Sequence, residues 1–263
     1  MKVRCSVGLY PDPIEAEDCL KCSLDLVMPP CGYGYRLLAT LFASENDRSN
    51  EIHVTDITGC LLKAYLDKRF PTPEFVHHKL VRCLGTAVHD GLLRTDEHFQ
   101  AEVPVGNEFL MGRADTIYNN NDIEDVKTVR WYKPSNGIYG NHAHQVNIYR
   151  HLARKEGKLR IQYIDLSGPT RCSKCKVPVE MIDCVLQCPR CGYAPRDAHL
   201  GAMQVEVLVM DADEVEDFIR SRTEILRNAL ESGIPPEAEP DWLCYYCPHA
   251  CEYSYNPQNS RGE

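Results

Sequence analysis

Apolar and polar residues follow a helical pattern in four segments of the chain. The first segment, TDITGCLLKAYLDKRF, carries Thr55 or Asp56 where an oxygen side chain can cap the free N–H groups of a helix start. The last segment has an acidic first turn and carries Gly233 at its end, which suits a helix terminus. The sequence therefore predicts helices over residues 55–70, 74–95, 138–156 and 211–233.

Strand character prevails in five further runs. Gly106 and Asn107 separate the first two runs, and a Gly-Asn pair is typical of a hairpin turn. The order of the elements predicts an α/β fold with one mixed sheet flanked by helices. The predicted strands cover residues 99–105, 108–118, 122–129, 159–166 and 202–210.

Segments rich in cysteine or proline surround and interrupt this predicted core. We expect them to be metal-bound additions to the core, because 263 residues suffice for one substantial core with small satellites. The predicted organisation is an N-terminal segment at 1–50, a core at 51–169 and 197–233, an inserted zinc ribbon at 170–196, and a C-terminal segment at 234–263.

The composition is that of an ordinary globular protein, with 43% apolar and 25% charged residues. No apolar run approaches the roughly 18 residues that a membrane helix needs, and the first residues lack the apolar stretch of a signal peptide. We therefore expect a cytoplasmic protein without a membrane partner. The formal charge of −9 argues against a general nucleic-acid coat protein, although a local basic groove could still bind DNA.

Cysteine is the strongest compositional signal, with 14 residues, several of them in C-x-x-C pairs. In a reducing compartment this spacing favours metal ligation over the disulfide framework of a secreted protein. Two pairs match the double knuckle of a zinc ribbon, and a redox disulfide pair is the alternative. The predicted zinc ligands are Cys172, Cys175, Cys188 and Cys191, with Cys184 between them as a spare buried thiol.

Two further sets of cysteines are less regular. One C-x-x-C pair with two scattered partners predicts a second zinc site, with unconnected buried thiols as the alternative. The ligands of that site would be Cys5, Cys19, Cys22 and Cys31. A terminal triplet supplies three ligands, and Cys60 on the first predicted helix is the candidate for the fourth. Zinc and iron–sulfur clusters both accept four thiolates, so the residues leave that metal open. This third set is Cys60, Cys244, Cys247 and Cys251.

Two acids and a lysine occupy neighbouring predicted strands. Asp125 and Lys127 are two residues apart and face the same side of their strand, which Asp115 on the preceding strand could reach. Carboxylates suit Mg²⁺ or Mn²⁺, and such a cation lowers the pKa of bound water and stabilises charge on a phosphate. Lys127 would orient that water or help to deprotonate it. A solvated, salt-bridged strand face is the alternative interpretation.

Further residues extend this trio to an ordered set, G-x-x-x-H, G-x-x-D, D-x-K and Q-x-x-x-Y. The set resembles the PD-(D/E)XK nuclease superfamily in its RecB-like branch, over roughly residues 54–253. Cys60 and the terminal triplet bracket the set as in the iron–sulfur members of that branch. Among these, the short single-domain chain is similar to the CRISPR-associated exonucleases of spacer acquisition. The set consists of Gly85, His89, Gly112, Asp115, Asp125, Lys127, Gln145 and Tyr149.

The resemblance implies a restriction-endonuclease-like sheet and metal-dependent hydrolysis of DNA phosphodiester bonds, by an exonuclease most active on single strands or frayed ends. Partner proteins of CRISPR adaptation are implied as well. The implied ligands of Mg²⁺ or Mn²⁺ are His89, Asp115, Asp125 and the carbonyl of Val126, with Lys127 catalytic and Gln145 and Tyr149 supporting the site or positioning DNA. The implied ligands of a [4Fe–4S] cluster are Cys60, Cys244, Cys247 and Cys251, with zinc as the alternative because the gap between the last two is short for the family.

Basic and aromatic residues follow Lys127 and could contact DNA. Arg130 and Lys133 could receive phosphates, and Trp131 and Tyr132 could stack on unpaired bases, with a solvated charged face as the alternative. His142 and His144 could also receive phosphates. Glu102 could be a further metal or DNA-positioning acid, but we expect an exposed strand residue there.

Other functions fit the same residues. A nuclease of identical chemistry could serve repair, a virus or a plasmid, which neighbouring genes would distinguish. A non-catalytic nucleic-acid adaptor held together by metal sites would show no cleavage in assays with EDTA controls. A redox sensor built on the cluster would respond to its oxidation state.

Overall fold

The computed structural model describes residues 2–25, 31–43, 51–71, 75–130, 135, 137–183, 185–240, 244, 247, 249 and 251. Two compact units make up the chain. The first comprises Met1–Glu51, Gly59–Val88 and Glu224–Glu263, and the second comprises Ile52–Thr58 and His89–Thr223. Helices α5 (Val76–Leu92) and α7 (Ala212–Ser232) contribute residues to both units. Within the described ranges, each helix is too short or too polar to cross a bilayer.

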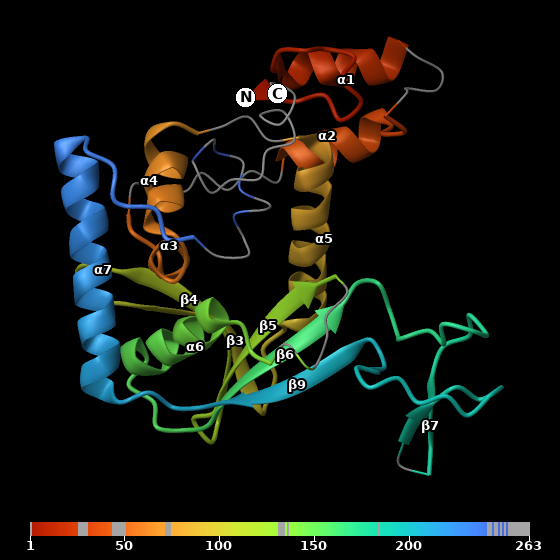
Figure 1. The fold of residues 1–263 in the computed structure, drawn as a ribbon. Helices are drawn as coiled ribbons and strands as arrows, with labels where there is room; N and C mark the ends of the chain where they lie inside the picture. The colour runs from red at the N-terminus through yellow and green to blue at the C-terminus, as the bar shows by residue number, and fades with distance from the viewer. Residues whose placement is uncertain are drawn as a thin grey trace. The chain divides into compact units, whose positions relative to one another are not determined.

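A mixed five-stranded sheet is the centre of the second unit (Figure 1). Its strand order is β3-β4-β5-β6-β9, and only β5 and β6 run parallel to each other. Parallel neighbours need a crossover, which helix α6 (Gly140–Leu152) provides. This arrangement confirms the predicted α/β fold with a mixed sheet flanked by helices, and each predicted strand overlaps an observed one. The strands are β3 (Phe99–Gly106), β4 (Met111–Tyr118), β5 (Ile123–Val129), β6 (Leu159–Asp165) and β9 (Ala202–Val207).

The predicted first helix is in fact two helices, α3 (Val54–Ile57) and α4 (Leu61–Arg69). Gly59 lies in the interruption, where its missing side chain makes helix formation costly. The helix also begins earlier than predicted, because the N–H of His53 donates to the Asp56 carboxylate at 2.9 Å, so Asp56 caps from inside the first turn. The break leaves Cys60 in an extended conformation at the N-terminus of α4.

Helix α6 is buried on more than one side. Its residues Gln145 to Tyr149 are all buried, because α6 packs against β4, β5 and β6 and also against α3. On its outer side, the His144 ring stacks on the Phe218 ring of α7 with their centroids 4.4 Å apart. The β6 residues that face the core, including Ile161 and Tyr163, are almost completely shielded from solvent. Residues on the inner faces of α6 and β5 are therefore held rigidly.

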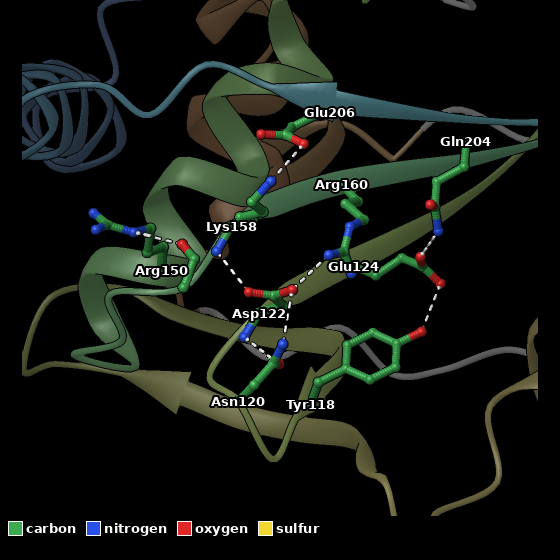
Figure 2. Close-up of polar contacts among 10 residues, drawn as sticks. Tyr118, Asn120, Asp122, Glu124, Arg150, Lys158, Arg160, Gln204 and Glu206 are labelled. Atoms are coloured by element: carbon green, nitrogen blue, oxygen red, sulfur yellow. Dashed lines mark hydrogen bonds and ion pairs between the residues drawn. The ribbon is translucent and has the colours of Figure 1, made fainter.

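Polar contacts on one side of β5 fix the register of four strands (Figure 2). The Asp122 carboxylate accepts the Lys158 backbone N–H at 2.8 Å and pairs with the Arg160 guanidinium at 2.5 Å. Glu124 accepts the Gln204 amide and, at 3.4 Å, the Tyr118 hydroxyl. Removing one partner from a buried charged network leaves the other uncompensated. These contacts occupy the side of β5 opposite Asp125, so Glu124 has a structural role.

An inserted ribbon joins β6 to β9. Its two short strands, β7 (Glu180–Ile182) and β8 (Val185–Gln187), pair antiparallel (Figure 1). A buried pair closes the base of the insert, since His199 Nε2 lies 3.3 Å from Asp165 Oδ2. Backbone bonds from Asp165 N–H to the Gly201 carbonyl and from Thr170 N–H to the His199 carbonyl continue this closure.

The first unit has a small core of its own. Val3, Leu38, Leu41 and Val76 are nearly fully buried and form one apolar cluster, on which Cys19 and Cys83 also pack. The short strands β1 (Lys2–Val3) and β2 (Ile14–Glu15) pair next to helices α1 (Ala16–Asp25) and α2 (Tyr35–Ala43).

Candidate functional site

Three side chains from different elements converge in the second unit. His89 lies in the last turn of α5, Glu102 on β3 and Asp115 on β4. One ligand atom of each lies within 4.8 Å of the others, and His89 Nδ1 is 3.6 Å from Asp115 Oδ2. An imidazole and two carboxylates so placed could hold a divalent cation.

Glu102 belongs to this group, contrary to our expectation of an exposed strand residue. The antiparallel ladder pairs Ala101 with Thr116 and Val103 with Ala114, which places Glu102 opposite Asp115. Its φ of 55° is a conformation that non-glycine residues rarely adopt, and such strain concentrates at functional positions. The carboxylate also pairs with Arg113. The signal available in the sequence was the hairpin register, which matches position 102 with position 115.

Asp125 and Lys127 extend from β5 toward the same place. Lys127 Nζ lies 2.8 Å from Asp125 Oδ2, and the Asp125 side chain is 0% exposed. Apart from this ion pair, neither oxygen of Asp125 has a hydrogen-bond partner within the described residues. A buried carboxylate oxygen without a donor is costly unless a cation satisfies it.

Asp115 is electrostatically linked to Asp125. Its Oδ2 accepts the backbone N–H of Val126 at 2.8 Å. Burial, followed by the nearby negative charge of Asp125, raises the pKa of the Asp115 carboxyl to about 7. Two adjacent carboxylates with so little solvent form a strongly negative position, which a bound cation would neutralise.

His89 faces the same group of charges. Burial and the positive charge of Lys127 lower the pKa of its imidazole, while Asp125, Glu102 and a hydrogen bond to the Val126 backbone oppose that change. A neutral imidazole is the form that binds metals. The structure therefore brings together the residues for which the sequence predicted a common ion, namely His89, Asp115, Asp125 and the Val126 backbone.

Gln145 and Tyr149 lie one turn apart on α6. The Gln145 Nε2 donates to the Tyr149 hydroxyl at 2.7 Å, and both side chains are buried. Burial and the charge of Asp125 raise the pKa of Tyr149. The Tyr149 ring packs closely against β4 at Gly112. A Cβ at that position would stand 2.9 Å from Tyr149 Cε1 and 2.7 Å from Val54 Cγ2. The predicted glycine before Asp115 thus has a packing reason.

The residues predicted to contact DNA differ in their exposure and in the contacts that they make. Arg130 is exposed after the end of β5. His142 is a poor phosphate ligand, since burial and Lys127 lower its pKa to about 3 and its Nδ1 lies 3.1 Å from the Tyr163 hydroxyl. His144 is occupied by its stack on Phe218. Trp131, Tyr132 and Lys133 lie outside the described residues.

The four ribbon cysteines converge as the spacing predicted. Cys172, Cys175, Cys188 and Cys191 bring their sulfur atoms within 4.8 Å of one another. Cys172 Sγ is 3.7 Å from Cys191 Sγ, and hydrogen bonds, led by the Cys175 backbone N–H, lower the pKa of the Cys172 thiol to about 7. Tetrahedral zinc with Zn–S bonds of ~2.3 Å needs sulfur atoms ~3.8 Å apart. The geometry therefore suits a structural metal ion. Cys184 lies outside the described residues.

One of the C-terminal cysteines, Cys247, lies near α4 in the first unit. His249 Nε2 is 2.6 Å from Asp67 Oδ1 on α4, and Lys63 and Asp67 both influence the pKa of Cys247, which burial raises. Cys60 begins the same helix. In the described part of the chain, this set and that of Cys5, Cys19, Cys22 and Cys31 are not among the groups that converge within 4.8 Å. The predicted iron–sulfur ligation stays a prediction.

The fold and site together define an α/β protein with a mixed sheet, a candidate cation site and a four-cysteine ribbon. No family model and no curated protein matches the sequence. Solved structures similar to the chain include the following two. SSO0001 has 18% identity and a TM-score of 0.47, covering 91% of this chain and 97% of its own. A phage-related exonuclease from Haemophilus somnus 129PT has 13% identity and a TM-score of 0.40, covering 70% and 95%.

Proposed function

We propose that the chain is a metal-dependent DNA nuclease that hydrolyses phosphodiester bonds. The observation that carries the proposal is the buried Asp125, which forms an ion pair with Lys127 through Oδ2 while neither of its oxygens accepts a hydrogen bond from the described residues. A purely structural ion pair would leave neither oxygen unsatisfied. The negative charge of Asp125 acts on the pKa of both Asp115 and His89. This supports a cation shared by the three residues rather than a salt-bridged strand face.

The donor set favours a hard cation. His89, Asp115, Asp125 and the Val126 carbonyl would supply one imidazole nitrogen and several oxygens, a combination that suits Mg²⁺ or Mn²⁺. When bound, the cation would lower the pKa of a water ligand and offset negative charge on a phosphate. Glu102 would complete the negative side of the site.

Lys127 is the catalytic residue in this proposal. Its ammonium, oriented by Asp125, would hold the attacking water and balance the charge that develops on the phosphate oxygens. Tyr149 and Gln145 would keep the wall of the site in place through their mutual hydrogen bond. Neutral His142 beside Lys127 adds no competing charge.

We further propose an exonuclease that acts on single-stranded or frayed DNA, with CRISPR spacer precursors as candidate substrates. Arg130, exposed just beyond Lys127, supports phosphate contact next to the site, with Trp131, Tyr132 and Lys133 proposed to continue it. The ribbon is proposed to hold zinc, and Cys60, Cys244, Cys247 and Cys251 a [4Fe–4S] cluster next to α4.

The proposal is tested by incubating the purified chain with end-labelled single-stranded and double-stranded DNA. We expect cleavage with Mn²⁺ or Mg²⁺, faster on single strands, and none in EDTA. Restoration of cleavage when the cation is added back would separate metal dependence from damage by the chelator. Binding of DNA without any cleavage under these conditions would favour the adaptor instead.

Glu102 provides a more specific prediction. Replacing it in Glu102→Gln should raise the Mn²⁺ concentration for half-maximal cleavage by roughly ten-fold, as loss of a group that supports a metal typically does. The measurement is a Mn²⁺ titration of the cleavage rate. Glu108→Gln, in the exposed β3–β4 loop, is the matched control and should leave the titration unchanged. An unaltered Mn²⁺ requirement in Glu102→Gln would remove Glu102 from the site.

A further inference from the structure

One cavity in the first unit is lined by all four cysteines of the N-terminal segment. Cys5, Cys19, Cys22 and Cys31 face it together with Tyr10 and several apolar side chains. These cysteines are separated by up to 26 positions in the sequence, from 5 to 31, so their meeting is a property of the fold.

Two of the cysteines are pre-positioned by helix α1. Cys19 and Cys22 are three residues apart, which puts their side chains on one face of the helix with Cβ atoms roughly 5–6 Å apart. Cys5 begins a turn in which the Gly8 N–H donates to the Cys5 carbonyl at 3.4 Å, and Gly8 has a φ of 68°. The ribbon contains related turns, from Cys172 to Lys176 and from Cys188 to Gly192, that end on a residue with positive φ.

We propose that Cys5, Cys19, Cys22 and Cys31 bind one zinc ion in this cavity as a second structural zinc site. Thiolates are ligands that zinc prefers. The four half-buried sulfur atoms are not among the groups that converge within 4.8 Å in the described residues, so zinc binding would draw them together to the ~3.8 Å separations of a tetrahedral site. The ribbon already has such a separation, at 3.7 Å.

The electrostatics agree with this geometry. Burial, followed by the charges of Cys31, Cys22 and Cys5, raises the pKa of Cys19 to about 11, so the four sulfur atoms lie close enough to affect one another. Tyr10 hydrogen-bonds to Cys22 and would orient that thiolate, as groups outside a metal's own ligands commonly do. Bound zinc removes the mutual repulsion of the thiolates.

The role of this ion would be to stabilise the N-terminal part of the first unit. Among the described residues, the apolar cluster there has four buried members, Val3, Leu38, Leu41 and Val76. Small cores commonly need a metal or a disulfide for stability. Cys19 packs on this cluster while it also faces the cavity. Zinc would thus tie α1 and the chain after β1 to the core without any part in DNA cleavage.

Metal analysis of the full-length chain tests the inference. We expect two equivalents of zinc in the wild type, one in the double variant Cys19→Ser with Cys22→Ser, and two in Cys83→Ser. Cys83 packs on the same cluster but does not line the cavity, so it is the matched control. Iron should be the same in all three. Two zinc equivalents in the double variant, or a loss of iron in place of zinc, would overturn the inference.

A second measurement needs no variant and so does not depend on folding. The wild-type chain is alkylated before and after zinc removal, and cysteine peptides are quantified by mass spectrometry. Cys19 and Cys22 should be protected until the zinc is removed, while Cys83 should react equally in both samples. Equal labelling of Cys19 in both samples would contradict the inference. Either result leaves the nuclease proposal unaffected, because that proposal is read from DNA cleavage.

Discussion

The Lys127→Ala variant should lose DNA cleavage by about 10³-fold while it retains the ability to bind Mn²⁺. Removing one group that stabilises the charge of a transition state costs on the order of 10²–10³ in rate, and Lys127 would also orient the attacking water. The measurement is the single-turnover cleavage rate at saturating Mn²⁺. A rate within a few-fold of the wild type would show that Lys127 is not catalytic.

The same variant leaves the buried Asp125 without its partner, so loss of activity must be separated from loss of fold. Truncating one member of a buried pair typically costs 3–5 kcal/mol of stability. We therefore expect a lower melting temperature in EDTA, partly recovered by Mn²⁺, which would occupy the vacated negative site. Lys158→Ala is the matched control, because Lys158 directly precedes β6 and its exposed side chain pairs with Glu206. That control should cleave DNA at the wild-type rate.

Patterns that depend on local spacing predicted the structure well. The strand periodicity identified β5 and placed Asp125 and Lys127 on one side of it, and the structure pairs them at 2.8 Å. The ribbon cysteines converge because each knuckle is a short turn that its own sequence determines. In both cases, residues only a few positions apart fix the geometry, so a single sequence contains the necessary information.

Some features of the structure were not predicted from the sequence. The helix break at Gly59 was missed because the apolar pattern continues across it, while the capping of α3 by Asp56 depends on backbone geometry. Glu102 was taken for a surface residue because its partner, Asp115, is set by the hairpin register rather than by nearby residues. The hydrogen bond from Gln204 to Glu124 was also not predicted, because the two residues are 80 positions apart in the sequence.

The Asp115→Asn variant should lose metal-dependent cleavage and yet be more stable than the wild type in EDTA at pH 8. Burial and Asp125 raise the pKa of Asp115 from 3.8 to about 7 in the folded protein. Between these values the folded state holds a proton that the unfolded state releases, so the free energy of unfolding falls as the pH rises from about 4 to about 7. Above pH 7 the full cost of the buried charge is present.

Asparagine removes that cost because it carries no charge, while its amide oxygen can still accept the Val126 N–H. The rise in pKa corresponds to at most about 4 kcal/mol, so we expect an increase in melting temperature of several degrees in EDTA at pH 8. The difference should vanish near pH 4, where the wild-type carboxyl is protonated in the folded state.

At pH 8, adding Mn²⁺ should raise the melting temperature of the wild type but not of the variant. The wild type should then be the more stable of the two. A variant that is less stable than the wild type in EDTA at pH 8, or that gains the same stability from Mn²⁺, would mean that Asp115 is an ordinary structural acid.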